Sequence, residues 1–272
     1  MTSLANHQSN ESTKLILLGN SGSGKTGALA SLVGAGYKLF ILDYDNGLDP
    51  LKSYVKHDFP DKLGNVEYRT LRDKYKTTPS MTGSQVEGTP TAFTEGLKML
   101  DKWAYTDTDG SKIDLGKPST WGPDCIVVID SSTFFADAAF NWAQFMNPGA
   151  KDNRQIYFAA QQAFENTIAL LTSKDFKPNV IVISHIRYST TQDGVTKGFP
   201  TAVGSALGPT IPAYFNSIAL METIGTGDKI QRQIRTTPTA IIDLKNPAPF
   251  DMVPALPIKT GLADFFKTLK GK

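Results

Sequence analysis

The sequence predicts an α/β fold in which a mainly parallel sheet is flanked by helices and carries antiparallel strands at one edge. Short apolar segments alternate with helical segments along the chain, which is typical of a parallel sheet covered on both faces. Near the end of the chain, segments 218–224 and 229–236 flank the turn 225–228 and predict an antiparallel hairpin. We expect one domain over residues 14–272, preceded by a flexible tail over residues 1–13.

Strands are predicted where short runs of residues are rich in branched or aromatic side chains. The run 126–129, Ile-Val-Val-Ile, places Asp130 at the tip of its strand. Segment 65–70 alternates in polarity, which suits a further strand. The remaining predicted strands cover residues 14–18, 37–42 and 180–184.

Helices are predicted between these strands, with ends set by residues that begin or stop a helix. The first follows the glycine-rich turn and ends near residue 32, before Gly34 and Gly36. Ser132 is expected to cap a helix that runs to Trp142, and Pro148 lies in the turn that breaks it. Two further helices are expected over residues 90–103 and 153–171.

Three segments are predicted to be insertions outside the core of the fold. Residues 74–90 are expected to be irregular and mobile. Residues 106–122 are rich in Asp, Gly, Ser and Pro, which predicts a surface segment, and residues 187–204 form a further loop. The late segment 247–257 is proline-rich and extended, and we interpret it as a candidate subunit contact.

Composition excludes several classes of protein. The 272 residues carry a net charge of +2, so a surface for nucleic acid has to be local. Cys125 is the only cysteine, which excludes an intrachain disulfide and favours a reducing compartment. No run reaches the roughly 18 apolar residues needed to cross a membrane, and the polar start lacks the apolar core of a secretory signal. We therefore expect a soluble, cytoplasmic protein without a membrane partner.

Residues 19–26, Gly-Asn-Ser-Gly-Ser-Gly-Lys-Thr, match the complete phosphate-loop pattern G-x-x-x-x-G-K-[ST] between a predicted strand and a predicted helix. Glycines let such a loop turn its N–H groups inward around a polyphosphate, and the helix adds the positive end of its dipole. Lys25 is expected to reach the β- and γ-phosphates of ATP, and the Thr26 hydroxyl to ligate Mg²⁺. The predicted nucleotide-binding positions are Gly19, Asn20, Ser21, Gly22, Ser23, Gly24, Lys25 and Thr26.

Asp130 is expected to supply the second half of the Mg²⁺ site. Many nucleotide-hydrolysing motors place a water-activating glutamate directly after this aspartate, but here Ser131 occupies that position. Asp43 and Asp45 follow the strand 37–42, and side chains two residues apart on a strand share a face. Because strand ends gather at the ligand edge of an α/β sheet, we expect Asp45 to orient the attacking water, with Asp43 as the alternative.

The order of these motifs resembles a RecA-like ATPase core: GNSGSGKT, then a carboxylate after the next strand in ILDYD, then VVIDSS. In RecA-like proteins the catalytic carboxylate comes from that earlier strand and is usually glutamate; the matching residue here is Asp45. They also carry Gln or His at a later strand tip, where it senses the γ-phosphate, and the resemblance gives this role to His185. The chain is most similar to compact RecA-like ATPases encoded by bacteriophages, some of which are single-strand annealing recombinases. For a phage-encoded protein this resemblance implies a location in the cytoplasm of the host cell.

The resemblance also implies macromolecular partners. Two loops that hold single-stranded DNA correspond to residues 147–154 and 187–204, where cations suit phosphates and aromatic rings suit base stacking. The candidate DNA-binding residues are Lys151, Arg154, Arg187, Tyr188, Lys197 and Phe199. RecA-like ATPases work as homo-oligomeric rings or filaments in which cations of the next subunit complete each active site. The candidates for this role are Lys229, Arg232 and Arg235, although a charged edge that discourages aggregation is an equal interpretation.

These observations favour a DNA-dependent ATPase of the RecA-like class that acts in phage-type recombination or single-strand annealing, with a single-strand DNA-binding protein as a further partner. A helicase core or loader is the alternative among motors. A small-molecule kinase also uses a phosphate loop, but the Arg-poor segment 106–122 does not resemble a kinase lid. A nucleotide-gated binding module with little turnover stays open because no glutamate follows Asp130.

Overall fold

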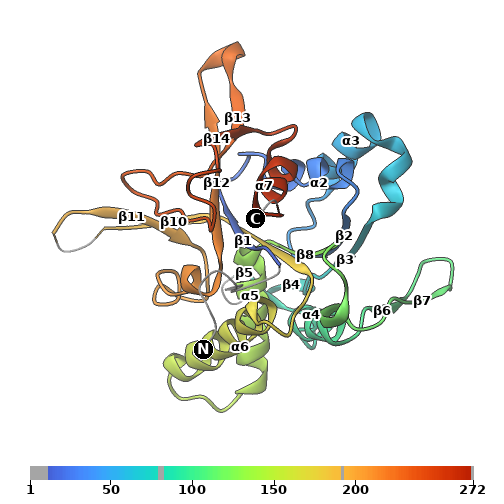
Figure 1. Ribbon diagram of the computed structural model, residues 1–272. Helices are drawn as coiled ribbons and strands as arrows, with labels where there is room; N and C mark the ends of the chain where they lie inside the picture. Colours follow the sequence, from blue (N-terminus) through green and yellow to red (C-terminus); the bar gives the residue numbers. More distant parts are fainter. Residues whose placement is uncertain (1–11, 79–82, 191–192, 271–272) are drawn as a thin grey trace, which may run out of the picture.

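Eight strands form the central sheet of this computed structural model, which describes residues 12–78, 83–190 and 193–270 (Figure 1). The strands are β1 (Lys14–Leu18), β2 (Lys38–Asp43), β3 (Val66–Thr70), β8 (Cys125–Asp130), β9 (Asn179–Ser184), β12 (Ser217–Ile224), β13 (Gln231–Arg235) and β14 (Ala255–Pro257). They lie in the order β14-β13-β12-β1-β9-β8-β2-β3. Neighbours from β12 to β3 are parallel, whereas the β12–β13 and β13–β14 pairs at one edge are antiparallel. The predicted α/β fold class with antiparallel edge strands is confirmed.

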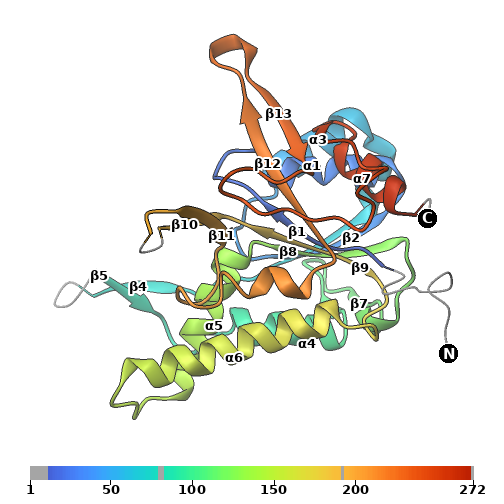
Figure 2. The same cartoon turned by 60° about the vertical axis from the view of Figure 1, so that its left-hand side comes forward.

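Helices cover both faces of this sheet (Figure 2). One face packs against α4 (Ala92–Asp101), α5 (Ser132–Met146) and α6 (Asn153–Thr172), and the other against α1 (Lys25–Ala28), α2 (Ala30–Gly34), α3 (Asp49–Asp58) and α7 (Gly261–Lys270). Alternate residues of β1 divide between the two hydrophobic clusters, with Ile16 in the first and Leu17 in the second. Because both faces of the sheet are buried, the sequences of central strands such as β1 and β8 are almost continuously apolar. None of the helices in the described part of the chain combines the length and apolar character that a membrane span requires.

The strand register gathers the chemically important segments at one edge of the sheet. Asp43 pairs with Asp130 across β2 and β8, and Leu18 pairs with Ser184 across β1 and β9. The Gly19 N–H then donates to the Ser184 carbonyl over 3.1 Å. The phosphate loop therefore begins beside the end of β9, and the carboxyl ends of β2 and β8 lie next in the sheet.

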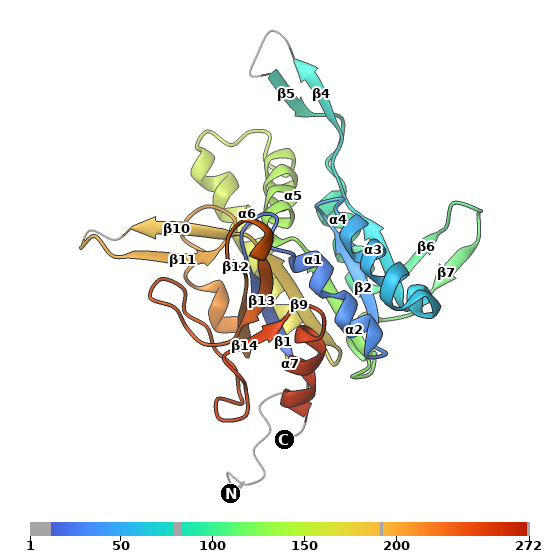
Figure 3. The same ribbon diagram turned by 90° about the horizontal axis from the view of Figure 1, so that it is seen from above.

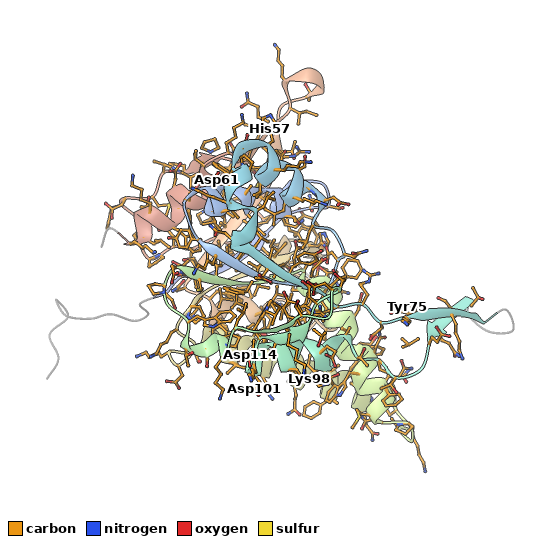
Figure 4. All side chains as sticks on the ribbon, turned by 90° about the vertical axis from the view of Figure 1, so that its right-hand side faces the viewer. His57, Asp61, Tyr75, Lys98, Asp101 and Asp114 are labelled. Carbon is orange, nitrogen blue, oxygen red and sulfur yellow. The ribbon has the colours of Figure 1, made fainter. Side chains whose placement is uncertain are left out.

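Each of the three predicted insertions overlaps a β-hairpin that projects from the body of the molecule (Figure 3). The hairpins join β4 (Tyr75–Thr78) to β5 (Gly83–Val86), β6 (Ala104–Thr106) to β7 (Lys112–Asp114), and β10 (Ile186–Thr190) to β11 (Thr196–Pro200). The prediction that residues 74–90 are irregular is therefore wrong for both β4 and β5. Their ladder leaves most described side chains exposed, so no apolar period marks these strands in the sequence. Tyr75, the first residue of β4, is labelled in Figure 4. It contacts α5, because the Asn141 amide donates a hydrogen bond to its hydroxyl over 3.0 Å.

The remaining differences concern element boundaries. Ser131, not Ser132, occupies the N-cap position of α5, and that helix runs on to Met146. A flexible tail is predicted over residues 1–13, and residues 1–11 of it lie outside the described part of the chain. The prediction is wrong for the last two residues: the Thr13 N–H donates to the Asn179 side chain over 2.9 Å, and Ser12 is also buried.

Lys14 is a fully buried lysine at the start of β1, at the opposite end of this strand from the phosphate loop. Its Nζ donates to the carbonyl oxygens of Phe176 (2.6 Å) and Pro178 (2.8 Å), and it lies 5.2 Å from the centroid of the Phe176 ring. Burial disfavours the charged ammonium and lowers the pKa of Lys14 to about 7.

The free energy of unfolding is expected to rise with pH between about 7.5 and 9 because of Lys14. In the unfolded chain this lysine keeps a pKa near 10.5, whereas in the folded protein it titrates near 7. Within that window the unfolded chain binds one more proton, so stability increases by up to about 1.4 kcal/mol per pH unit. Urea denaturation of wild type and Lys14→Met at several pH values measures the difference in slope. Equal slopes in the two proteins would contradict this assignment.

Candidate active site

The loop between β1 and α1 has the geometry of an anion site. Gly22 and Gly24 have φ angles of 75° and 100°, in the left-handed region that glycine adopts without a steric penalty. The Ser23 hydroxyl is buried between them and has no hydrogen-bond partner among the described residues. A buried, unpaired hydroxyl in such a loop fits a ligand that brings its own acceptors, as a polyphosphate does.

Lys25, the first residue of α1, lies folded against this loop. Its side chain is buried, and its Nζ donates to the carbonyl oxygens of Gly19 (2.8 Å) and Asn20 (2.9 Å). Burial lowers the pKa of Lys25, while the negative charges of Asp130 and Asp45 act in the opposite direction. The ammonium is thus held at the mouth of the loop with two carboxylates nearby.

Thr26 and Asp130, the two residues predicted to hold Mg²⁺, are in direct contact. The Thr26 Oγ1 donates to Asp130 Oδ2 over 2.7 Å, and the Asp130 side chain is almost fully buried at the end of β8. Burial raises the pKa of Asp130 to about 7, and the hydrogen bond from Thr26 opposes this rise. The charges of Asp45 and Asp43 raise the pKa of Asp130 further, and Asp43 pairs with Asp130 across β2 and β8.

Asp45 lies just beyond the end of β2 and is held by the residue that follows Asp130. The backbone N–H and the Oγ of Ser131 both donate to Asp45 Oδ1, over 2.9 and 2.7 Å. In the described structure Asp45 Oδ2 has no hydrogen-bond partner, and the side chain is partly exposed. One oxygen therefore fixes the carboxylate while the other is available to a ligand or a water molecule.

Asp43, the alternative base, has a different environment. It is 1% exposed, and both of its oxygens are occupied: Gly47 N donates to Oδ1 over 3.2 Å and Thr70 Oγ1 to Oδ2 over 3.1 Å. Burial raises the pKa of Asp43, and these hydrogen bonds oppose the rise. Asp43 shapes the turn that follows β2, and the geometry favours Asp45 for contact with solvent.

His185 follows β9 directly and joins this cluster to the β10–β11 hairpin. Its Nδ1 lies 3.1 Å from Thr133 Oγ1 in α5, and its carbonyl accepts from the N–H of Thr201, just after β11. Burial lowers the pKa of His185; the charge of Lys25 lowers it further and that of Asp45 opposes this. The imidazole is therefore neutral near pH 7 and lies within electrostatic range of both residues.

Comparison with known proteins agrees with this geometry. A family model described as an AAA domain matches residues 11–248, a range that includes the phosphate loop, Asp130 and His185. The chain belongs to the AAA domain family. It is an ATPase-type domain with a phosphate loop. No curated protein sequence matches this AAA domain.

Two solved structures are distantly similar to this AAA domain. The KaiC-like protein PH0186 from Pyrococcus horikoshii OT3 aligns over 90% of this chain and 84% of its own, with 9% identity and a TM-score of 0.43. The flagellar accessory protein FlaH from Methanocaldococcus jannaschii aligns over 89% of this chain and 83% of its own, with 9% identity and a TM-score of 0.39.

The residues of this AAA domain fit a nucleotide with Mg²⁺, as the family implies. Hydroxyl and carboxylate oxygens are the ligands that Mg²⁺ prefers, and Thr26 and Asp130 offer one of each within 2.7 Å. Within the described ranges, no cluster of three or more His, Cys, Asp or Glu residues forms a metal site of its own. Mg²⁺ usually takes one or two carboxylates from the protein and further ligands from phosphate and water.

The residues predicted to bind DNA lie away from this cluster, on the α5–α6 turn and the β10–β11 hairpin. Lys151 is exposed, whereas the Arg154 guanidinium is bound to Asp152 at 2.6 Å. On the hairpin, Arg187 and Tyr188 are exposed, and Lys197 forms an ion pair with Asp243 at 2.9 Å. Phe199 is half-buried and pairs with Arg187 across the two strands.

The three cations predicted to act in the next subunit lie along the β12–β13 hairpin. Lys229 is exposed in a short helical turn before β13. The Arg235 Nε donates to Glu222 of the same chain over 2.9 Å. Arg232 lies on the opposite face of β13, and its Nη2 donates to the Gly22 carbonyl of the same chain's phosphate loop over 3.4 Å.

Two residues of the site were not identified from the sequence. Ser131 holds Asp45, and Thr133 contacts His185. The position of Ser131 directly after Asp130 is the available signal, but in the sequence alone it indicates only the absence of a glutamate. The role of Thr133 depends on how α5 packs beside the end of β9, which no local pattern encodes.

Proposed function

We propose that this AAA domain hydrolyses ATP with Mg²⁺ and couples hydrolysis to binding of single-stranded DNA, in phage-type recombination or strand annealing. One observation carries the ATPase part: Thr26 contacts Asp130 at 2.7 Å while Ser131 holds Asp45 at 2.7 Å. Phosphoryl transfer requires a phosphate-binding cation, a metal site and a group that positions the attacking water. Lys25, the Thr26–Asp130 pair and Asp45 supply these three at one edge of the sheet.

Hydrolysis follows from the roles of these side chains. The loop N–H groups and Lys25 hold the phosphates, and Asp45 Oδ2 accepts a hydrogen bond from water in line with the γ-phosphorus. Ser131 keeps the carboxylate in that orientation through Oδ1, so little reorganisation is needed when ATP arrives. Thr26 and Asp130 would hold Mg²⁺, which would supply positive charge to neutralise the phosphates.

The DNA part of the proposal is supported by the side chains on the projecting hairpins. The β10–β11 hairpin, the β4–β5 hairpin and the α5–α6 turn extend to the same side of the molecule (Figure 2). Exposed aromatic rings there include Tyr75, Phe158 and Tyr188, at 54%, 61% and 46% exposure. Together with Lys151 and Arg187 they provide the stacking rings and phosphate-binding cations that single strands require.

A homo-oligomer, ring or filament, is part of the same proposal. The tip of the β12–β13 hairpin projects from the body (Figure 1) and carries Lys229 beside Ile230, whose apolar side chain is 54% exposed. An exposed apolar residue next to a cation at a projecting tip suits contact with another subunit. A single-strand DNA-binding protein is proposed as a further partner on the resemblance alone.

Phosphate release from ATP, with and without oligo(dT), tests the proposal. We expect turnover that requires Mg²⁺ and increases with DNA, and fluorescence anisotropy should show DNA binding strengthened by a slowly hydrolysed ATP analogue. Arg187→Ala with Tyr188→Ala should weaken DNA binding without lowering ATP affinity.

Turnover that does not change with DNA would overturn the DNA part of the proposal and favour a small-molecule kinase. ATP binding without turnover would favour a nucleotide-gated module, and directional strand unwinding would favour a helicase core.

His185→Ala is expected to lower the ratio of DNA-stimulated to basal turnover. The side chain bonds Thr133 near the cluster, while its backbone anchors the base of the β10–β11 hairpin, so its loss separates the two sites. His57→Ala is the matched control, because the His57 side chain on α3 is 87% exposed and its hydrogen bond within the described structure is to the neighbouring Asp58 (Figure 4). An unchanged stimulation ratio in His185→Ala would remove His185 from the coupling.

A further inference from the structure

Arg232 lies against the phosphate loop of its own chain. In β13 it is two residues before Ile234, which is fully buried in the cluster on the α1 side of the sheet. Because alternate residues of a strand share a face, Arg232 extends from that same side, above α1. The Arg235 side chain lies on the opposite face of β13, where Glu222 binds it.

The contact depends on the missing side chain of Gly24. A Cβ at this position would lie 2.8 Å from Arg232 Cδ and 3.1 Å from Ile258 Cδ1, so the arginine stem rests directly on the loop. Gly24 also has a φ of 100°, a second reason why no other residue fits well here. The Arg232 guanidinium reaches the Gly22 carbonyl at 3.4 Å.

Arg232 has no carboxylate partner among the described residues, although it sits beside an anion-binding loop. Its hydrogen bond to Gly22 is long and uses one of the five N–H donors of a guanidinium. A guanidinium with free donors binds phosphate oxygens in charge-assisted pairs. These features are those of a phosphate ligand in the same chain.

We propose that Arg232 is a nucleotide-binding residue that contacts the polyphosphate bound by its own chain, and does not act on the site of a neighbouring subunit. This rests on the proposed function, because it concerns the nucleotide of the same site. It divides the cations of the β12–β13 hairpin: Arg232 serves the loop of its own chain, Arg235 is engaged by Glu222, and Lys229 at the tip is left for a second subunit.

Binding of a fluorescent ATP analogue to single variants tests the first half of this inference. Arg232→Gln removes the charge but keeps an aliphatic stem over Gly24, and we expect its dissociation constant to rise about ten- to a hundredfold. Arg232→Lys should recover part of the loss. Arg69→Ala is the matched control, because Arg69 lies on β3 at the other edge of the sheet and stacks on Tyr105 at 4.7 Å. Unchanged binding by Arg232→Gln would overturn the inference.

Mixing two variants shows whether Arg232 acts on the phosphate loop of its own chain or on that of a neighbouring subunit. In a 1:1 mixture of Arg232→Gln with Lys25→Ala, the Lys25→Ala chains offer an intact Arg232 to their neighbours. Binding should stay weak if Arg232 serves its own loop, and recovery of tight binding would show that it acts between subunits and would overturn the inference. Wild type that binds no ATP would overturn the proposed function itself, whereas wild-type binding unaffected by Arg232→Gln would overturn this inference alone.

Discussion

Replacing Asp45 by asparagine is expected to lower ATP turnover about a hundredfold or more while ATP binding stays intact. Asparagine keeps the acceptor oxygen that Ser131 binds, so the side chain remains in place. It loses the negative charge that orients water and accepts its proton. Single-turnover phosphate release gives the rate, and a fluorescent ATP analogue gives the affinity.

Asp43→Asn is the comparison that gives this result its meaning. Both Asp43 oxygens already accept hydrogen bonds from Gly47 and Thr70, so this change should affect the turn after β2 more than the chemistry. We expect Asp43→Asn to retain most of its turnover and to melt at a different temperature. If Asp43→Asn lost turnover and Asp45→Asn did not, the two roles assigned here would have to be exchanged.

The elements predicted well from the sequence are those in which one local pattern decides the structure. Residues 126–129 are apolar on both faces, which is typical of a strand in a parallel sheet covered on both sides. The pattern of residues 19–26 is specific because glycine, lysine and threonine each have a separate physical role. The meeting of Thr26 with Asp130 could be anticipated as well, because Asp130 ends β8 and Thr26 lies in α1, just after the phosphate loop at the same edge of the sheet.

The features that escaped prediction depend on distant parts of the chain. The β4–β5 hairpin has no buried face, so its strands carry no apolar alternation. Ser131 acquires its role only because β2 and β8 are neighbours, which brings Asp45 within 2.7 Å of its hydroxyl. Arg232 touches the phosphate loop at Gly22, which is 210 residues away in the sequence. Spacing along β13 indicates which face Arg232 occupies, but not that the phosphate loop lies beneath it.

Replacing Asp130 by asparagine is expected to lower Mg²⁺-dependent turnover strongly and yet to stabilise the nucleotide-free protein at pH 8. Asparagine offers Thr26 an acceptor oxygen but gives Mg²⁺ no charge, so turnover should fall about a hundredfold or more. The stability effect has the opposite sign. Burial raises the pKa of Asp130 to about 7 from its ordinary value of 3.8, so the ionised carboxylate destabilises the folded state.

The pH dependence separates this cause from simple repacking. Below the unfolded pKa of 3.8 the carboxyl is protonated in both states, and the penalty is absent. As pH rises towards about 7 the unfolded chain releases its proton first, so wild type loses stability relative to Asp130→Asn, and above about 7 the difference is constant. Melting temperatures at pH 5 and pH 8 should therefore diverge, by about 2–4 °C for each kcal/mol. A difference of the same size at both pH values would mean that charge burial is not its cause, whereas a growing difference would show that the Mg²⁺ site is maintained at the expense of stability.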